Sequence, residues 1–222
     1  MDQMKKADKM IFHAMSNLTI RSVMEKLYDT DAYTFWHSVS VARMSLVLGL
    51  TYGLKDKELT DLMYAALFHE IGMVKVTEEI KRDRTPLTMI PKDKGQKHPI
   101  VGAEMIANIG YFSSAVVTAI RCHHENYDGS AIIYHEAGEK ANLYSRIIRI
   151  CDIYDAMADD HVYTSEVVHK RILNVITAAR GKELDPSVVS LFLFVKDPGK
   201  VENRGASRIK RVVTENFQLD AC

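Results

Sequence analysis

Two adjacent histidines, His123 and His124, open the segment HHENYDGS, which directly follows the apolar run AVVTAIRC. The chain has only nine histidines, so this doublet marks the segment as a candidate site of chemistry. Neighbouring residues of an α-helix point roughly 100° apart. The two imidazoles can therefore serve one cluster only if it lies between them or if the helix ends here, as Asn126 and Gly129 indicate. The doublet belongs either to a metal site or to a solvated helix end.

Acidic side chains interrupt two other strongly apolar segments. His69 and Glu70 end the run LMYAALFHEIG, and Asp152 lies within the isoleucine-rich RIIRICDIYDAM. Burying an ionised carboxylate without a partner costs several kcal/mol, so each acid needs a cation, a hydrogen-bond donor or a cleft. No lysine or arginine nearby in the sequence obviously supplies a cation for Glu70. Asp152 could instead bond the end of a neighbouring helix.

Histidine and carboxylate without thiolates form the ligand set of zinc, iron or manganese. Five of the nine histidines lie near predicted helix ends or in polar segments between helices, and one metal centre would satisfy them together. Taken singly, His37 and His98 are more often partly exposed or core-capping histidines than ligands. The candidate residues are His37, His69, Glu70, His98, His123, His124 and Asp152.

The elements that must position these residues are helices, because apolar residues recur with helical spacing along most of the chain. An amphipathic segment precedes Asp31, and a second apolar run covers residues 39–50. The polar stretch 78–97 carries two prolines and predicts a long loop, with room for one helical turn, that covers something. Further helices are expected at roughly 57–71, 98–109, 112–124, 139–158, 163–180 and 186–196. We therefore expect an all-α fold.

Composition excludes several classes of protein. The 222 residues are 47% apolar and 26% charged, enough to bury a core, and 29 basic residues balance 29 acidic ones. This balance argues against a nucleic-acid polymer as partner. Three widely spaced cysteines predict neither a disulfide framework nor a thiolate zinc site, which favours a cytoplasmic protein. No apolar run approaches the roughly 20 residues that a membrane span needs.

The order of the motifs resembles the HD superfamily of metal-dependent phosphohydrolases. HSVSVA, AALFHEIG, KHPIVGAEMI, HHENYDG, RIIRICDIYDAM and GKELDP follow one another from about Asp31 to Phe194. The closest resemblance is to the HD-GYP branch, the bacterial cyclic di-GMP phosphodiesterases. It implies an HD-domain helical bundle over residues 31–196, an additional N-terminal helix packing on it within 1–30, and a short irregular tail over 197–222.

The resemblance also implies a metal centre. In family terms, all seven candidate residues are metal ligands, and Glu70 replaces the aspartate that bridges two metals. Some relatives hold a third metal through a carboxylate, which Tyr33 replaces here. The expected cofactors are two divalent transition-metal ions, iron or manganese, with zinc as a further option.

Other family motifs are altered. Met73 replaces the lysine that usually meets substrate phosphate, and Ala131–Ile133 replace the Gly-Tyr-Pro that names the branch. His161 stands where the family has an arginine, although Tyr163 is retained, and both are candidate substrate-binding residues. Lys75 is a candidate replacement cation by proximity. With Glu70, it completes the catalytic candidates.

The leading hypothesis is thus a metal-dependent phosphohydrolase with weak or shifted activity toward a cyclic dinucleotide or another phosphoester. The alternative is a catalytically silent, metal-containing signalling module that uses residues 131–139 to meet a protein partner or sense a nucleotide. A third reading, with less support from the motifs, is a more general nucleotide hydrolase. The oligomeric state stays open.

Overall fold

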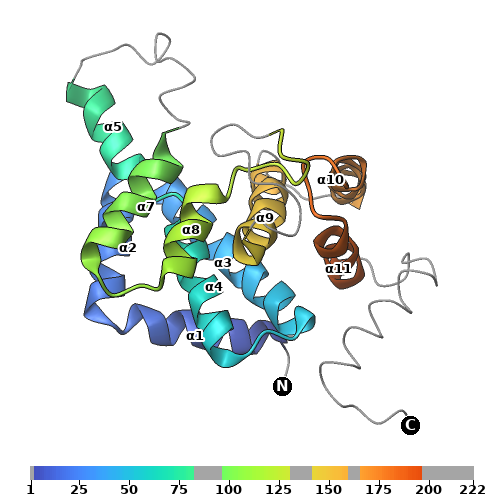
Figure 1. The fold of residues 1–222 in the computed structure, drawn as a ribbon, viewed down its shortest axis with the longest axis horizontal. Coiled ribbons are helices and arrows are strands. Elements are labelled where there is room, and N and C mark those ends of the chain that lie inside the picture. Colours follow the sequence, from blue (N-terminus) through green and yellow to red (C-terminus); the bar gives the residue numbers. More distant parts are fainter. Residues whose placement is uncertain (1–2, 83–96, 131–141, 160–165, 197–222) are drawn as a thin grey trace.

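The chain folds into a helical bundle in the computed structural model (Figure 1), which describes residues 3–82, 97–130, 142–159 and 166–196. These residues contain no β-strand beyond an isolated bridge between Arg180 and Leu184. The all-α expectation is confirmed. The helices are α1 (Gln3–Met15), α2 (Leu18–Thr30), α3 (Ala32–Tyr52), α4 (Asp56–Phe68), α5 (Met73–Arg82), α7 (His98–Ile109), α8 (Ser114–Cys122), α9 (Leu143–Asp159), α10 (Glu166–Ala178) and α11 (Pro186–Lys196).

Helix α3 is the centre of the bundle and contacts α1, α2, α4, α9 and α11. It begins where the Asp31 side chain accepts hydrogen bonds from the backbone N–H groups of Tyr33 and Thr34, at 3.1 and 3.3 Å. It ends at Gly53, whose φ of 95° suits a residue without a side chain. Because neighbours cover it on several sides, α3 can present one side chain, His37, from within the core.

The N-terminal segment forms two helices, where the sequence suggested one. Asn17 separates them, because its side-chain oxygen accepts hydrogen bonds from the N–H groups of Thr19 and Ile20 and so starts α2. Both α1 and α2 contact α3 and one another. They bury Ile11 and Leu27 in the same core as the other helices.

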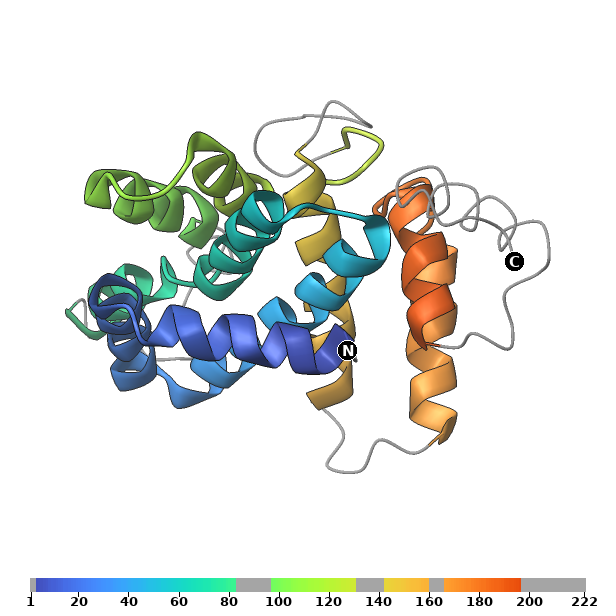
Figure 2. The same ribbon diagram turned by 90° about the horizontal axis from the view of Figure 1, so that it is seen from below.

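The remaining helices are arranged around α8 and α9. Helix α8 contacts α4, α7 and α9, while α10 and α11 pack against α9. Figures 1 and 2 show α10 and α11 side by side at one end of the molecule, opposite α5 and α7. The predicted helices 57–71 and 112–124 are shorter in the structure, since α4 ends at Phe68 and α8 at Cys122. Their last predicted residues, including four metal-site candidates, therefore lie on turns.

The polar stretch 78–97 is partly helical, because α5 continues to Arg82. The prediction allowed one helical turn in this stretch, and the structure places it at the start, where residues 78–82 extend the amphipathic turns that begin at Met73. Residues 83–96 of that predicted loop lie outside the described residues. The same holds for residues 131–139 and for the tail 197–222. None of the described helices is long and apolar enough to cross a membrane.

Candidate metal centre

The structure brings all seven candidate residues together from five parts of the bundle. His37 lies on α3, Asp152 on α9, and His98 is the first residue of α7. The other four occupy the turns that follow α4 and α8. The residues form two groups, within each of which one potential ligand atom per side chain lies within 4.8 Å of all the others. The groups are His37, His69, Glu70 and Asp152, and Glu70, His98, His123 and His124.

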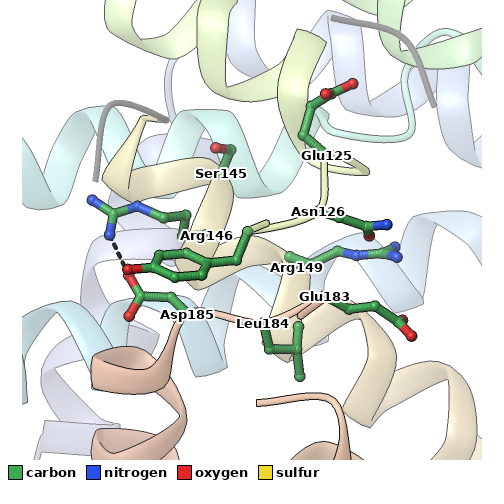
Figure 3. Close-up of a pocket in the computed structure, with 9 residues that line it drawn as sticks. Glu125, Asn126, Ser145, Arg146, Arg149, Glu183, Leu184 and Asp185 are labelled. Carbon is green, nitrogen blue, oxygen red and sulfur yellow. Dashed lines mark hydrogen bonds and ion pairs between the residues drawn. The ribbon is translucent and has the colours of Figure 1, made fainter. Parts of the chain in front are cut away.

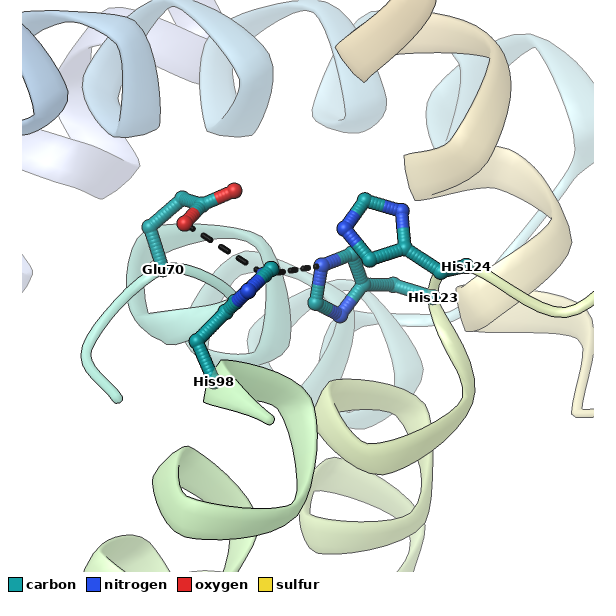
Figure 4. Close-up of side chains that lie close together, drawn as sticks. All are labelled: Glu70, His98, His123 and His124. Atoms are coloured by element: carbon teal, nitrogen blue, oxygen red, sulfur yellow. Dashed lines mark hydrogen bonds and ion pairs between the residues drawn. The ribbon is translucent and has the colours of Figure 1, made fainter. Parts of the chain in front are cut away.

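Glu70 belongs to both groups and directs one carboxylate oxygen toward each. Its Oε1 lies 3.7 Å from Nε2 of His69, and its Oε2 lies 3.4 Å from Nε2 of His98. Figure 4 shows Glu70 facing the histidines of the second group, which come from α7 and the end of α8. This is the placement that a carboxylate bridging two ions would need.

Each group contains a short contact between two potential ligand atoms. Nε2 of His37 lies 3.1 Å from Oδ1 of Asp152 in the first group. In the second, Nε2 of His98 lies 3.2 Å from Nε2 of His123. Imidazole nitrogens and carboxylate oxygens thus converge on small spaces, and these are ligand types of a divalent transition metal.

Backbone carbonyls fix which ring nitrogens face the centre. The Nδ1 atoms of His69 and His123 lie 2.8 and 2.7 Å from the carbonyl oxygens of Ala66 and Ile120. A carbonyl only accepts, so each Nδ1 must donate and each Nε2 keeps its lone pair. Nε2 of His69 is buried and makes no hydrogen bond within the described part of the chain. A metal ion would satisfy this atom, so the site fits a divalent cation.

Burial keeps three of the imidazoles neutral, which is the form that binds metal. It lowers the pKa of His69 and takes that of His123 well below its ordinary value, with help from neighbouring histidines. Burial and the nearby charge of His98 lower the pKa of His124 to about 4. At neutral pH these rings offer lone pairs without first losing a proton.

The acidic residues of the two groups, Glu70 and Asp152, are ionised, and acidic neighbours raise the pKa of His37. Burial raises the pKa of Glu70, but its hydrogen bond with His98 and the surrounding histidines lower it more. Burial also raises the pKa of Asp152, but its hydrogen bond with His37 and the nearby His69 and His124 together lower it more. Burial lowers the pKa of His37 too, but hydrogen bonds to Asp152 and Asp155 bring it to about 10. A metal ion would therefore replace the proton on His37.

Asp155 is a site residue that the sequence reasoning missed. Its Oδ2 accepts a hydrogen bond from Nδ1 of His37 at 2.8 Å, which turns the other ring nitrogen toward Asp152. The signal was present in DIYD, because residues three apart on a helix share a face. Asp155 thus orients His37, a candidate ligand, by binding the ring nitrogen that does not contact Asp152.

Replacing Asp155 by alanine is expected to weaken metal binding about 10- to 100-fold, the usual cost of losing a group that orients a ligand. Competition with a chromophoric chelator would measure this change, and Trp36, the single tryptophan, gives a fluorescence signal next to His37. Asp29→Ala, which removes an exposed carboxylate from α2, is the control. Equal affinity of Asp155→Ala and the wild-type protein would contradict the prediction.

The other candidate residues are less closely tied to the centre. Lys75 is exposed on α5, two residues after Met73, and its catalytic role stays a prediction. Tyr33 is 55% exposed, and its ring is parallel to that of His37 with 6.5 Å between the centroids. His161 and Tyr163 lie outside the described residues.

Comparison with known proteins finds relatives that are cyclic dinucleotide phosphodiesterases. A cyclic di-GMP phosphodiesterase of Pseudomonas aeruginosa is 32% identical over 62% of this chain and 33% of its own length. A cyclic di-GMP phosphodiesterase response regulator of Xanthomonas campestris is 29% identical, covering 70% of the chain and 42% of that protein. A 3′3′-cGAMP-specific phosphodiesterase of Vibrio cholerae is 27% identical, covering 71% and 30%. The chain thus spans less than half the length of these curated relatives.

A solved structure and a family model complete the comparison. The crystal structure of a cyclic GMP-AMP-specific phosphodiesterase of Vibrio cholerae has the same fold, with a TM-score of 0.56 at 20% identity, over 83% of this chain and 49% of that one. The family model of the HD domain matches residues 34–157, more than half of the 222 residues. The match includes all seven candidate ligands. The chain belongs to the HD domain family.

Proposed function

We propose that this chain is a metal-dependent phosphodiesterase whose substrate is a cyclic dinucleotide, with cyclic di-GMP the first candidate. The observation that carries the proposal is the pair of ligand groups that share Glu70. Metal ions held about 3.5–4 Å apart suit in-line displacement at phosphorus. The names of the relatives, which are cyclic di-GMP and 3′3′-cGAMP phosphodiesterases, support this class of substrate. A cytoplasmic location is part of the proposal.

Each side chain has a defined part in this proposal. His37, His69 and Asp152 would hold one ion, His98, His123 and His124 the other, and Glu70 both. When bound, such ions lower the pKa of a water molecule and neutralise phosphate oxygens. Iron and manganese are the proposed ions, and the ligand set accepts zinc as well.

Met73 is the main reason to expect weak or shifted activity. It begins α5 directly after the turn that carries Glu70, and its thioether cannot neutralise a phosphate. Losing one preorganised donor at a reacting group can lower the rate by about 10²–10³. A chain without that lysine would need another cation or would turn over its substrate slowly.

Turnover of cyclic di-GMP by protein loaded with Mn²⁺ or Fe²⁺ tests the proposal directly. Chromatography of the products should show hydrolysis by the wild-type protein, and none by Asp152→Ala or after chelation of the metal. A panel with 3′3′-cGAMP and bis(p-nitrophenyl) phosphate would reveal a shifted substrate. If none is hydrolysed, and the double variant Glu70→Asp, Met73→Lys recovers no activity, the phosphodiesterase proposal is wrong.

The same observation at Met73 favours a second candidate, a silent module that keeps its metals and binds a nucleotide or a signalling protein. Calorimetry separates the two functions. Binding of cyclic di-GMP by metal-loaded protein without any product would support the silent module, whereas sustained turnover would exclude it.

A further inference from the structure

Two arginines one turn apart on α9 have different roles. Arg146 forms an ion pair with Asp185, which also accepts a hydrogen bond from the N–H of Ser187 at 2.6 Å and thereby starts α11. Figure 3 shows Arg149 pointing away from that pair. Arg146 thus stabilises the fold, and Arg149 is left for another task.

Arg149 lies between the metal centre and a neighbouring pocket. Its Nη1 is 3.0 Å from Nδ1 of His124, a candidate ligand of the second group. The same side chain lines a pocket, with about 270 Å³ of space partly open to solvent, between α9 and the segments 125–127 and 183–185 (Figure 3). Within the described part of the chain, no carboxylate lies at ion-pair distance from it, and its Nε has no acceptor.

The contact between Arg149 and His124 is incompatible with metal on that histidine. A guanidinium only donates, so Nδ1 of His124 must offer its lone pair in this contact. A neutral imidazole has one such lone pair and one N–H. Metal on Nδ1 would take the lone pair from Arg149, and metal on Nε2 would require the proton to be on Nδ1. Either way, metal binding frees the guanidinium.

A freed guanidinium beside a metal centre needs an anion. Two divalent ions would outweigh the charges of Glu70, Asp152 and Asp155, and Arg149 adds a further positive charge to a partly buried site. Like charges in such surroundings repel one another strongly unless a negative group joins them. Phosphate oxygens match the paired N–H groups of a guanidinium, which makes arginine a preferred phosphate ligand.

We propose that Arg149 binds a phosphate group of the substrate in the metal-loaded protein and supplies the cation that Met73 does not. This inference rests on the proposed function. Arg149 is then a specificity residue on α9, on a different helix from Met73.

Calorimetry with inorganic phosphate tests this role without depending on turnover. Arg149→Ala and Arg149→Gln, loaded with Mn²⁺, are expected to bind phosphate about 10- to 100-fold more weakly than the wild-type protein, as for a hydrogen bond to a charged group. Arg149→Lys should fall between, since lysine keeps the charge but not the paired donors. Metal content should be unchanged in all three. Arg21→Ala, which removes an exposed arginine from α2, is the control.

The outcomes separate this inference from the proposed function. Phosphate binding that depends on Arg149 in a protein that hydrolyses nothing would support the anion site and reject the phosphodiesterase. Hydrolysis of cyclic di-GMP with equal kcat/KM in Arg149→Gln and the wild-type protein would support the phosphodiesterase and reject the anion site. The inference is also overturned if the wild-type protein binds no phosphate, or if the folded variants lose their metal, because Arg149 would then support His124. Arg149→Gln keeps the three side-chain carbons and a polar end without the charge, and so guards against a folding defect.

Discussion

Replacing Glu70 by alanine is expected to remove both metal ions from the protein and to abolish phosphodiester hydrolysis. Glu70 is the one residue that the two ligand groups share, and its two oxygens face histidines of different groups. Without it, each ion would lose a ligand, and the remaining charges of Asp152 and Asp155 would have to balance two dications. Loss of the rate by at least about 10²–10³ is expected, with the removal of one preorganised group as the lower bound.

Elemental analysis of protein purified without chelator, expressed as metal per chain, measures this effect. Glu79→Ala removes an exposed carboxylate from α5 and should keep the wild-type metal content. Glu70→Asp should keep both ions, because aspartate also offers two oxygens, although its shorter side chain changes the bridging geometry. A folded Glu70→Ala protein that still holds two ions would show that Glu70 does not bridge.

Replacing Gly72 by alanine is expected to destabilise the fold and to displace His98 from the centre. A Cβ atom at residue 72 would lie 2.1 Å from the carbonyl oxygen of His98 and 2.7 Å from the backbone nitrogen of Gly102. Both neighbours are backbone atoms of α7, so the helix itself would have to move. Overpacking of this kind costs about 3 kcal/mol or more, which lowers the Tm of a domain of this size by about 6–12 °C.

Calorimetric unfolding of the metal-free protein, together with metal analysis, would check this prediction. Gly110→Ala is a matched control, because it also adds a methyl group beside α7 but into open space. Its φ of 69° costs an alanine about 1–2 kcal/mol, and the metal centre should be unaffected. If Gly72→Ala unfolded at the wild-type temperature and bound metal normally, the close approach of α7 to this turn would be refuted.

The fold class could be predicted from the sequence because helical periodicity is a local property. Apolar spacing and turn residues indicated most helices within a few residues of their observed ends. The errors also have local causes. Asn17 starts a second N-terminal helix by capping it, and amphipathic spacing carries α5 to Arg82, into the stretch predicted as a long loop with one helical turn.

The sequence by itself determined the types of the metal-site residues and their order along the chain. A buried carboxylate such as Glu70 has few ways to be satisfied, so residue chemistry already pointed to a cation. Whether these residues bind metal stays a prediction, but the structure places all of them in two adjoining groups.

Only the tertiary structure decided which of these residues meet. His37 and Asp152 are 115 positions apart, and their contact depends on how α3 packs against α9. The same packing made Asp155 a partner of His37 and sent the neighbouring arginines, Arg146 and Arg149, in different directions. Local spacing fixes the face on which a side chain lies. The neighbour on that face is set by helices packing into contact, and this arrangement is a property of the whole core.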